Sequence, residues 1–278
     1  MSGGGKIAIL GGRGMLGSDL IKIYNDNATV FDQPDFDITN YEQLRSVVES
    51  HETIINCAAY TNVDGAESQR EFAHKINADA AGRLGELAGE KNKYVLHIST
   101  DFVFDGKLDR PYVETDEPNP INEYGRSKLA GERALIESGC HYCILRLEWT
   151  FGLNGNNFVK KLLQLANEKD RLKVVTDQLG SPTATKEAAK AIHKLESEQV
   201  EGIFHFAAAG YASRFEIAKF IFDNKSVNVE LEPCTSEEFK RPAKRPLNSR
   251  FCCDKIAAVL DGPIGPWQGP LKEFLEKI

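Results

Sequence analysis

The sequence predicts an α/β fold in which helices cover both faces of a doubly wound parallel sheet. Short apolar runs alternate with helical patterns through the first half of the chain, and a glycine-rich stretch follows the first run. The apolar runs are continuous rather than alternating, which is typical of strands buried on both faces. With 278 residues, the chain is long enough for a large α/β domain and a smaller companion.

The elements are expected in a regular order at first and a less regular one later. Strands are predicted at 6–10, 28–31, 53–59, 94–99 and 143–147, with helices at 15–25, 41–50, 66–90 and 122–138. The second half predicts helices at 157–170, 184–197 and 214–223, strands at 173–177 and 202–210, a Pro- and charge-rich stretch at 233–250, and a short terminal helix. The 202–210 strand is expected to rejoin the main sheet. We therefore expect one domain from 1–150 plus about 184–209, and a smaller, discontinuous substrate-binding lobe from about 151–183 plus 210–278.

Composition excludes several classes of protein. The net charge of −7 gives no general reason to expect nucleic acid as a partner. No apolar run approaches the ~20 residues that cross a bilayer, and "MSGGGK" lacks the apolar core of a secretory signal. Six scattered cysteines are typical of reduced thiols, so we expect a cytoplasmic protein. Neither Cys140/Cys143 nor Cys252/Cys253 has a second ligand pair, so no metal site is predicted.

A glycine loop follows the first predicted strand. The stretch "GGRGMLG" places Gly11, Gly14 and Gly17 three residues apart, directly before a helix. Glycines at a strand–helix junction permit a tight turn, and the helix N-terminus offers free N–H groups to a pyrophosphate. This pattern predicts a Rossmann-type domain that binds NADH or NADPH, with loop contacts from Gly11, Arg13, Gly14, Met15, Leu16 and Gly17.

The cofactor preference has two interpretations. Asp32 follows the second strand, near the position of the acid that bonds the adenosine ribose of NAD. Arg13, inside the glycine loop, would instead neutralise the 2′-phosphate of NADP. Other cofactor contacts are expected at the carboxyl ends of strands, with Asp37 and Ile38 near the adenine and Ala58, Ala59 and Tyr60 near the nicotinamide.

Tyr124 and Lys128 lie four residues apart in a predicted helix, and therefore share one of its faces. The spacing alone is also common by chance. A lysine ammonium one turn away would lower the pKa of the tyrosine, which is otherwise a poor acid–base catalyst. "HISTDFVFDG" adds a hydroxyl donor, Thr100, where the fourth strand ends. Proton transfer to a substrate oxygen is therefore predicted from three features together: the glycine loop, the hydroxyl at the strand end and the Tyr/Lys pair.

With these motifs, the sequence resembles the extended short-chain dehydrogenase/reductase superfamily. Within it, the chain is similar to the dTDP-4-dehydrorhamnose reductase family, through motifs that run nearly end to end. "GGRGMLG" and "YGRSKLAGE" are shared across the superfamily, whereas "TNVDGAES", "DQLGSPT" and "RPLNSR" are more specific. The resemblance implies an NAD(P)H-dependent reduction of the 4-keto group of dTDP-4-dehydro-6-deoxy-L-mannose to dTDP-L-rhamnose, a precursor of surface polysaccharides.

The resemblance also implies the roles of individual residues. Tyr124 would donate the proton, Lys128 would tune it and hold the ribose, Thr100 would polarise the carbonyl, and Asp101 would orient Thr100 or the sugar. The nucleotide-sugar substrate would contact Val63, Asp64, Thr100, Phe102, Trp149, Asn157, Arg245 and Arg250. The last two arginines suit a diphosphate, although a solvated basic turn would carry the same residues.

Two positions depart from the family pattern. Glu148 precedes Trp149 where a small hydroxyl residue is usual, and the extra carboxylate would affect sugar preference or cofactor contacts. Some members form a homodimer through a glutamate-bound magnesium ion. The matching positions here are Asp19 and Lys186, and a lysine argues against that metal bridge while leaving a homodimer open.

Among other functions found on the same fold, the sequence argues against one and leaves two as alternatives. Dehydratases need an acid–base residue directly after the Thr-Asp pair, and Phe102 cannot transfer a proton. A reductase or epimerase of another nucleotide deoxysugar remains an alternative. So does a non-catalytic NADP-binding subunit similar to the regulatory subunit of methionine adenosyltransferase.

Overall fold

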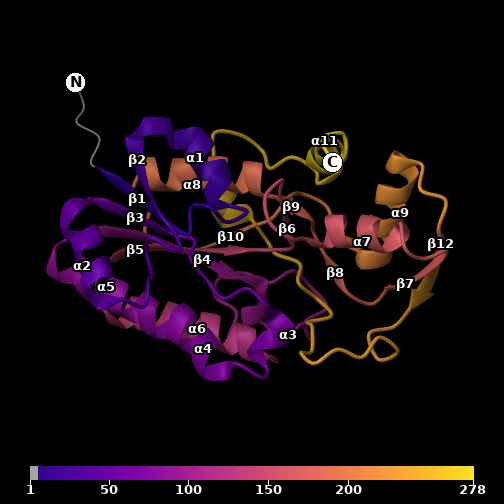
Figure 1. Ribbon diagram of the computed structural model, residues 1–278, viewed down its shortest axis with the longest axis horizontal. Coiled ribbons are helices and arrows are strands. Elements are labelled where there is room, and N and C mark those ends of the chain that lie inside the picture. The colour runs from indigo at the N-terminus through magenta and orange to yellow at the C-terminus, as the bar shows by residue number, and fades with distance from the viewer. Residues whose placement is uncertain (1–5) are drawn as a thin grey trace.

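A six-stranded parallel sheet forms the centre of the molecule (Figure 1). The computed structural model describes residues 6–278; residues 1–5, where no secretory signal is expected, lie outside the described residues. The strand order is β10 (Gly202–Phe206), β5 (His141–Leu147), β4 (Tyr94–Thr100), β3 (Thr53–Asn56), β1 (Ile7–Leu10) and β2 (Ala28–Phe31). The order reverses between β1 and β3, and such sheets bind ligands beyond the carboxyl ends of the strands at that reversal.

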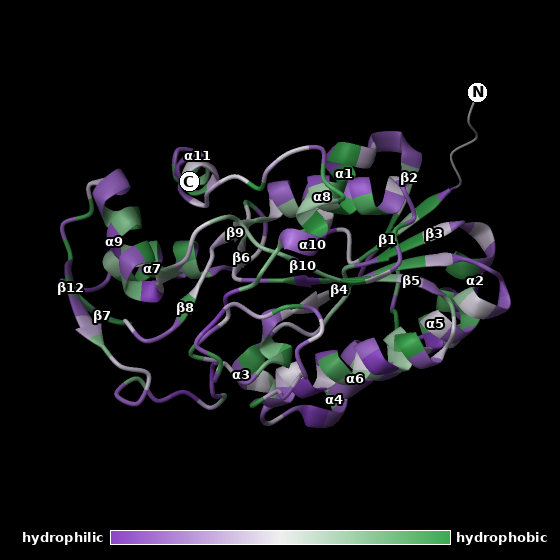
Figure 2. Ribbon diagram, turned by 180° about the vertical axis from the view of Figure 1, so that it is seen from behind, coloured by the Kyte–Doolittle hydropathy of each residue, from purple (hydrophilic) through white to green (hydrophobic). Residues whose placement is uncertain are grey.

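Helices cover both faces of this sheet (Figure 1). One face carries α1 (Gly17–Tyr24), α8 (Thr185–Ser197) and the short α10 (Asp254–Ala257), and the other carries α2 (Tyr41–Ser50), α5 (Ala80–Glu90) and α6 (Glu123–Glu137). Each face buries its own apolar core. Strand β1 is hydrophobic along its length in Figure 2, as expected for a strand covered on both sides. The predicted doubly wound α/β fold is confirmed.

The connection from β3 to β4 differs from the single helix predicted at 66–90. It contains α3 (Val63–Ala66), α4 (Arg70–His74), a π-helical turn (Lys75–Asp79) and then α5. Asn77 in the π-turn accepts a hydrogen bond from the Tyr60 N–H at 2.8 Å and donates to Ser127 Oγ at 2.9 Å. The wide turn therefore aims one amide side chain at the segment after β3 and at α6 together.

A second lobe lies beyond the carboxyl edge of the sheet (right side of Figure 1). It contains α7 (Phe158–Ala166), α9 (Arg214–Lys225), α11 (Gln268–Leu275) and the parallel pair β7 (Arg171–Val175) with β12 (Glu230–Cys234). The sequence pattern did not predict β12. Two short strand pairs connect the segments of this lobe. They are β6 (Thr150–Phe151) with β9 (Thr183–Ala184), and β8 (Leu179–Gly180) with β11 (Ala212–Ser213).

The expected division into two domains stays a prediction. The position of α10 is relevant to it, because this helix packs on the main sheet although its residues were expected in the second lobe. Ile256, in the stretch predicted for the second lobe, is buried in the core beneath α1 and α8. The strand predicted at 202–210 ends at Phe206, after pairing with β5 in the main sheet as expected. Between residues 6 and 278, no helix has the length and apolar composition needed to span a bilayer.

Candidate active site

The glycine loop joins β1 to α1 at the carboxyl edge of the sheet. Gly11 has a φ of 74°, and its N–H donates to Phe31 O at 2.8 Å. A Cβ at Gly11 would lie 2.7 Å from the Ala58 nitrogen, and one at Gly17 would collide with the Gly11 carbonyl oxygen. No side chain caps the N-terminus of α1. The tight loop and the uncapped helix therefore fit the pyrophosphate of a dinucleotide.

Asp32 and Arg13 lie next to one another at the end of β2. The Arg13 backbone N–H donates to Asp32 Oδ2 at 2.7 Å, so this carboxylate supports the glycine loop. The Arg13 guanidinium contacts Asp35 Oδ2 at 2.8 Å and the Gln33 carbonyl oxygen at 2.6 Å, and both charged side chains are mostly exposed. Because exposed ion pairs are weak, this guanidinium is available for a stronger anion such as a 2′-phosphate.

The other predicted cofactor residues differ in exposure. Leu16 and Ile38 are buried in the two cores of the sheet, so their side chains pack inward. Asp37 Oδ1 accepts from the Thr39 N–H and hydroxyl, each at 2.9 Å, and thereby stabilises the turn before α2. The remaining predicted contacts lie in the glycine loop or in the segment after β3, and they are Gly14, Met15, Ala58, Ala59 and Tyr60.

Tyr124 and Lys128 lie in the first turns of α6, which Asn122 caps by accepting from the Gly125 N–H at 2.8 Å. Lys128 is buried, and its ammonium donates to the Ile98 carbonyl oxygen at 2.7 Å on β4. Burial lowers the pKa of Lys128 to about 8. Burial, aided by the charge of Asp101, raises the pKa of Tyr124 to about 12, so the lowering expected from the sequence is not present in this arrangement.

His97 is the second contact of Lys128 and was not among the predicted residues. Its Nε2 lies 3.2 Å from Lys128 Nζ, and its Nδ1 lies 3.1 Å from Asn56 Nδ2. Burial and the Lys128 charge hold the pKa of His97 well below its ordinary value. The imidazole is therefore neutral. It contacts the Lys128 ammonium without placing a second positive charge beside it.

Thr100 and Asp101 follow one another where β4 ends, and both are buried. The Thr100 hydroxyl donates to Asp101 Oδ1 at 3.0 Å, and the Ser249 hydroxyl donates to Asp101 Oδ2 at 2.5 Å. Burial raises the pKa of Asp101 to about 6 despite these donors. Ser249, from the "RPLNSR" segment, therefore brings the second lobe into contact with the predicted catalytic residues.

A buried ion pair fixes α6 to the sheet. Glu132, one turn after Lys128, accepts from Arg146 Nε at 2.9 Å and from Arg146 Nη2 at 2.6 Å, and both side chains are almost fully buried. Ser99 also donates to Glu132. The pair thus links the helix of Tyr124 to β4 and β5. Glu132 lies within the "YGRSKLAGE" motif, which was the signal that could have identified it.

The structure separates the two arginines that were predicted for a diphosphate. Arg245 forms a bidentate pair with Asp64 of α3, at 2.5 and 2.9 Å. Arg250 instead contacts the Asp109 carbonyl oxygen at 2.5 Å and Asn248 Oδ1 at 2.8 Å. The predicted residue Val63 is half-buried beside Asp64 at the start of α3.

Trp149 lies between the two lobes with an unusual backbone φ of 42°. Glu148, directly before it, is fully buried, and its Oε1 accepts from the Ser181 N–H. Its Oε2 has no hydrogen-bond partner among residues 6–278, and burial, with the nearby Asp101, raises the pKa of Glu148 well above its ordinary value. Glu148 is therefore held to the backbone at Ser181 and is not exposed in an open pocket.

Asn157 and Phe102, also predicted for the substrate, have structural contacts. Asn157 caps α7 by accepting from the Lys160 N–H at 3.1 Å, and it donates to the Gly152 carbonyl oxygen at 2.9 Å. Phe102 packs edge-on against Tyr124, with 5.6 Å between ring centroids. Only Phe102 of these two therefore touches the predicted proton donor.

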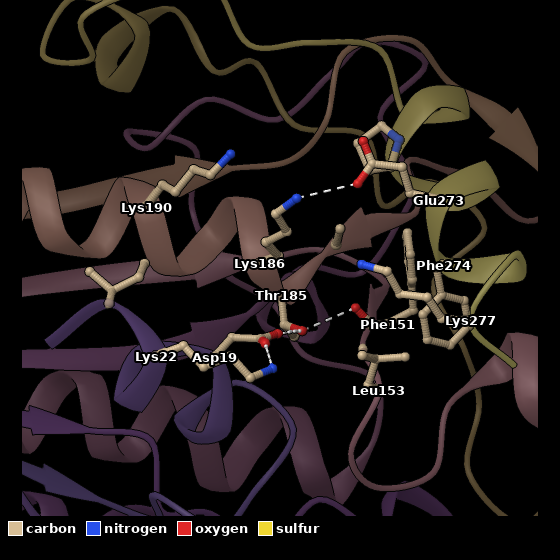
Figure 3. A pocket seen from close by; sticks show the side chains of 14 residues that line it. Asp19, Lys22, Phe151, Leu153, Thr185, Lys186, Lys190, Glu273, Phe274 and Lys277 are labelled. Atoms are coloured by element: carbon tan, nitrogen blue, oxygen red, sulfur yellow. Dashed lines mark hydrogen bonds and ion pairs between the residues drawn. The ribbon is translucent and has the colours of Figure 1, made fainter. Parts of the chain in front are cut away.

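A separate pocket of about 320 Å³ lies between α1, α8 and α11 (Figure 3). Asp19 in its wall accepts from Thr185 Oγ1 at 2.6 Å and from Lys22 at 2.7 Å. Lys186 points across the pocket to Glu273, with 3.3 Å between the charged atoms (Figure 3). The two positions considered for a magnesium bridge thus line one pocket, and each already contacts an oppositely charged group.

Comparison with known proteins extends these observations. The family model described as "RmlD substrate binding domain" matches residues 5–278. A dTDP-4-dehydrorhamnose reductase of Aggregatibacter actinomycetemcomitans is 37% identical over 97% of this chain and 98% of its own length. The Escherichia coli enzyme of the same name is 36% identical over 87% of this chain and 85% of its own length.

Two solved structures have the same overall fold. A dTDP-4-dehydrorhamnose reductase of Clostridium acetobutylicum has a TM-score of 0.93 and 38% identity, covering 98% of this chain and 99% of that one. The Bacillus anthracis enzyme, solved in complex with NADP, has a TM-score of 0.93 and 36% identity, covering 99% of both chains.

Proposed function

The chain belongs to the dTDP-4-dehydrorhamnose reductase family, and we propose that it reduces the 4-keto group of dTDP-4-dehydro-6-deoxy-L-mannose to give dTDP-L-rhamnose. The observation that carries this proposal is the convergence of three elements at one edge of the sheet. They are the glycine loop after β1, the Thr100–Asp101 pair at the end of β4, and Tyr124 with Lys128 on α6. A cytoplasmic location is part of the same proposal, because this sugar nucleotide and NADPH are cytoplasmic metabolites.

Each residue has a defined task in this reaction. NADPH, when bound, supplies the hydride that adds to C4 of the sugar. Tyr124 donates its proton to the C4 oxygen, and a pKa near 12 keeps the phenol protonated at neutral pH until the alkoxide develops. Thr100 orients the carbonyl oxygen and Asp101 orients Thr100. With a pKa of about 8, Lys128 is still largely charged at pH 7 and supports the phenolate that forms.

NADPH is the cofactor that the charge distribution favours. The exposed Arg13–Asp35 pair beside the glycine loop can exchange its carboxylate for a 2′-phosphate, which takes two charge-assisted hydrogen bonds from one guanidinium. Asp32 is already bonded to the loop backbone and has less capacity for a ribose hydroxyl.

The test is NADPH oxidation by the full-length protein with the keto-sugar generated in situ, followed by identification of the product. We expect stoichiometric formation of dTDP-L-rhamnose, faster with NADPH than with NADH. Absence of turnover with both cofactors would overturn the proposal. Sugar interconversion without net NADPH consumption would identify an epimerase instead, and stoichiometric binding to a partner synthetase that Tyr124→Phe leaves unchanged would identify a regulatory subunit.

A further inference from the structure

Arg214 covers the ring of Trp149, which the family resemblance implies as a substrate contact. Its guanidinium carbon lies 3.5 Å from the centroid of the Trp149 ring and 4.8 Å from that of Phe158. Gly180 packs against the same indole so closely that a Cβ there would lie 2.7 Å from Trp149 Cε2. The surface next to this indole is therefore cationic, and nothing in the sequence pattern predicted it.

The backbone under Arg214 is fixed. Arg214 is the first residue of α9, and Ser213 and Glu216 form a capping box around it. Its own N–H donates to the Gln178 carbonyl oxygen at 3.3 Å. A long side chain on so rigid an anchor, stacked on two aromatic rings, loses little further freedom when it binds a ligand.

The charge of Arg214 has no close counter-ion among residues 6–278. Its side chain makes no hydrogen bond there, and the carboxylates that influence it, Asp101 and Glu148, act from beyond ion-pair distance. Burial lowers the pKa of Arg214 to about 10, so it is cationic at neutral pH. A half-buried guanidinium with free N–H donors is costly to keep unless a ligand satisfies it.

Two further arginines lie close enough to Arg214 to affect its charge. Arg245 is already satisfied by its bidentate contact with Asp64, whereas Arg241 lies only within 3.8 Å of that carboxylate. The charges of Arg241 and Arg245 add to the lowering of the Arg214 pKa, which indicates that the three guanidinia repel one another. Three cations with one closely paired carboxylate leave an excess of positive charge, and a ligand with two negative charges would balance it.

We infer that Arg214, together with Arg241, binds the diphosphate of the nucleotide-sugar substrate, and that Arg214 rather than the Trp149 ring forms this part of the pocket surface. A planar guanidinium held flat by an indole presents its N–H edge to phosphoryl oxygens, which is the geometry of bidentate phosphate recognition. This inference rests on the proposed function for the identity of the substrate, but it concerns binding and not hydride transfer.

The experiment separates the charge of Arg214 from its packing. The affinity of dTDP is measured by calorimetry for the full-length protein and for Arg214→Lys, Arg214→Met and, as control, Lys219→Gln at an exposed site on α9. Loss of charge-assisted hydrogen bonds predicts that Arg214→Met binds dTDP about 10–100-fold more weakly, with a smaller loss for Arg214→Lys. The control binds normally, and all variants keep NADPH affinity, which verifies folding.

Two results would overturn the inference. If Arg214→Met binds dTDP as tightly as the control does, the guanidinium has no part in anion binding. If Arg214→Lys loses affinity while Arg214→Met keeps it, the side chain serves only to pack on Trp149. Because dTDP binding needs no turnover, a wild-type protein that binds dTDP through Arg214 and fails to oxidise NADPH would contradict the proposed reaction and leave this inference intact.

Discussion

At the scale of single residues, burial controls the chemistry of the proposed site more than neighbouring charges do. Burial is the largest cause of the raised pKa of Tyr124, of the raised pKa of Asp101 and of the lowered pKa of Lys128. All three groups are therefore held closer to their neutral forms than in water. A neutral phenol is the form required of a proton donor.

Replacement of the proposed proton donor isolates its role. We expect Tyr124→Phe to lower kcat by at least ~10²-fold, because general acid catalysis contributes about that much. NADPH affinity should be retained, since the phenol hydroxyl is one contact among many in the dinucleotide site. Steady-state NADPH oxidation and fluorescence titration of NADPH measure the two quantities. Near-normal turnover in this variant would exclude Tyr124 as the donor.

Asp101 should make the fold less stable as the pH rises. Its folded pKa of about 6 lies above the ordinary value of 3.8, so the folded state binds this proton more tightly than the unfolded state does. The penalty for the buried carboxylate is therefore absent below pH 3.8, grows between pH 3.8 and 6, and is complete above pH 6. Asp101→Asn removes this penalty.

We accordingly expect Asp101→Asn to raise the free energy of unfolding at pH 8 by roughly 1–3 kcal/mol, and by less at pH 5. Urea unfolding of both proteins at the two pH values measures the difference. The same variant should turn over more slowly, because Thr100 loses the carboxylate that orients it. A stability difference that is equal at pH 5 and pH 8 would contradict the assigned titration.

At the scale of elements, α6 carries the proposed proton donor and is held by a buried charge. The Glu132–Arg146 pair lies one turn beyond Lys128, and both side chains are almost fully buried. The helical pattern of residues 122–138 predicted the position of α6 to within a residue at each end. The ion pair left no such pattern, since a Glu in a helix and an Arg in a strand lie far apart in sequence.

Removing one member of this pair should be far more harmful than removing both. Arg146→Met leaves the Glu132 carboxylate buried without its cation, and we expect a loss of about 3–5 kcal/mol in the free energy of unfolding. The double variant Glu132→Leu/Arg146→Met has no unpaired charge and should recover most of that loss. Denaturant unfolding of wild type, both single variants and the double variant completes the cycle; additive losses would contradict the coupling.

At the scale of the whole molecule, the sequence predicted the sheet better than it predicted the contacts between the lobes. Continuous apolar strands and the glycine loop are local signals, so β1, β2 and α2 appear close to their expected positions. Arg214 comes from α9, whereas Arg241 and Ser249 come from the segment 241–250, and only the folded chain brings Ser249 to Asp101 at the end of β4. Ser249 lies within the "RPLNSR" motif but was not singled out there, and Arg214 and Arg241 lie in none of the motifs quoted for the substrate site.

The segment 241–250 connects the second lobe to the first, and Asp64 anchors it. Asp64 accepts from the Arg245 guanidinium and, at 3.1 Å, from the Ala243 N–H, so one carboxylate of α3 fixes both the side chain and the backbone of this segment. The Asp64–Arg245 pair is partly exposed, and screening limits its contribution to stability to about 1 kcal/mol or less. Its larger effect should be on where the proposed diphosphate-binding arginines lie.

We therefore expect Asp64→Asn to raise the KM for the nucleotide sugar about tenfold, as expected when a charge-assisted contact is lost, while the KM for NADPH stays unchanged. The matched control is Asp261→Asn, which removes the carboxylate of another pair between residues distant in sequence, Asp261–Lys194; Asp261 is far more exposed and lies outside the site. Steady-state kinetics with each substrate varied in turn measures both constants. An equal rise in both KM values would mean that Asp64 supports the whole cleft, and an unchanged KM for the sugar would show that segment 241–250 keeps its position without this carboxylate.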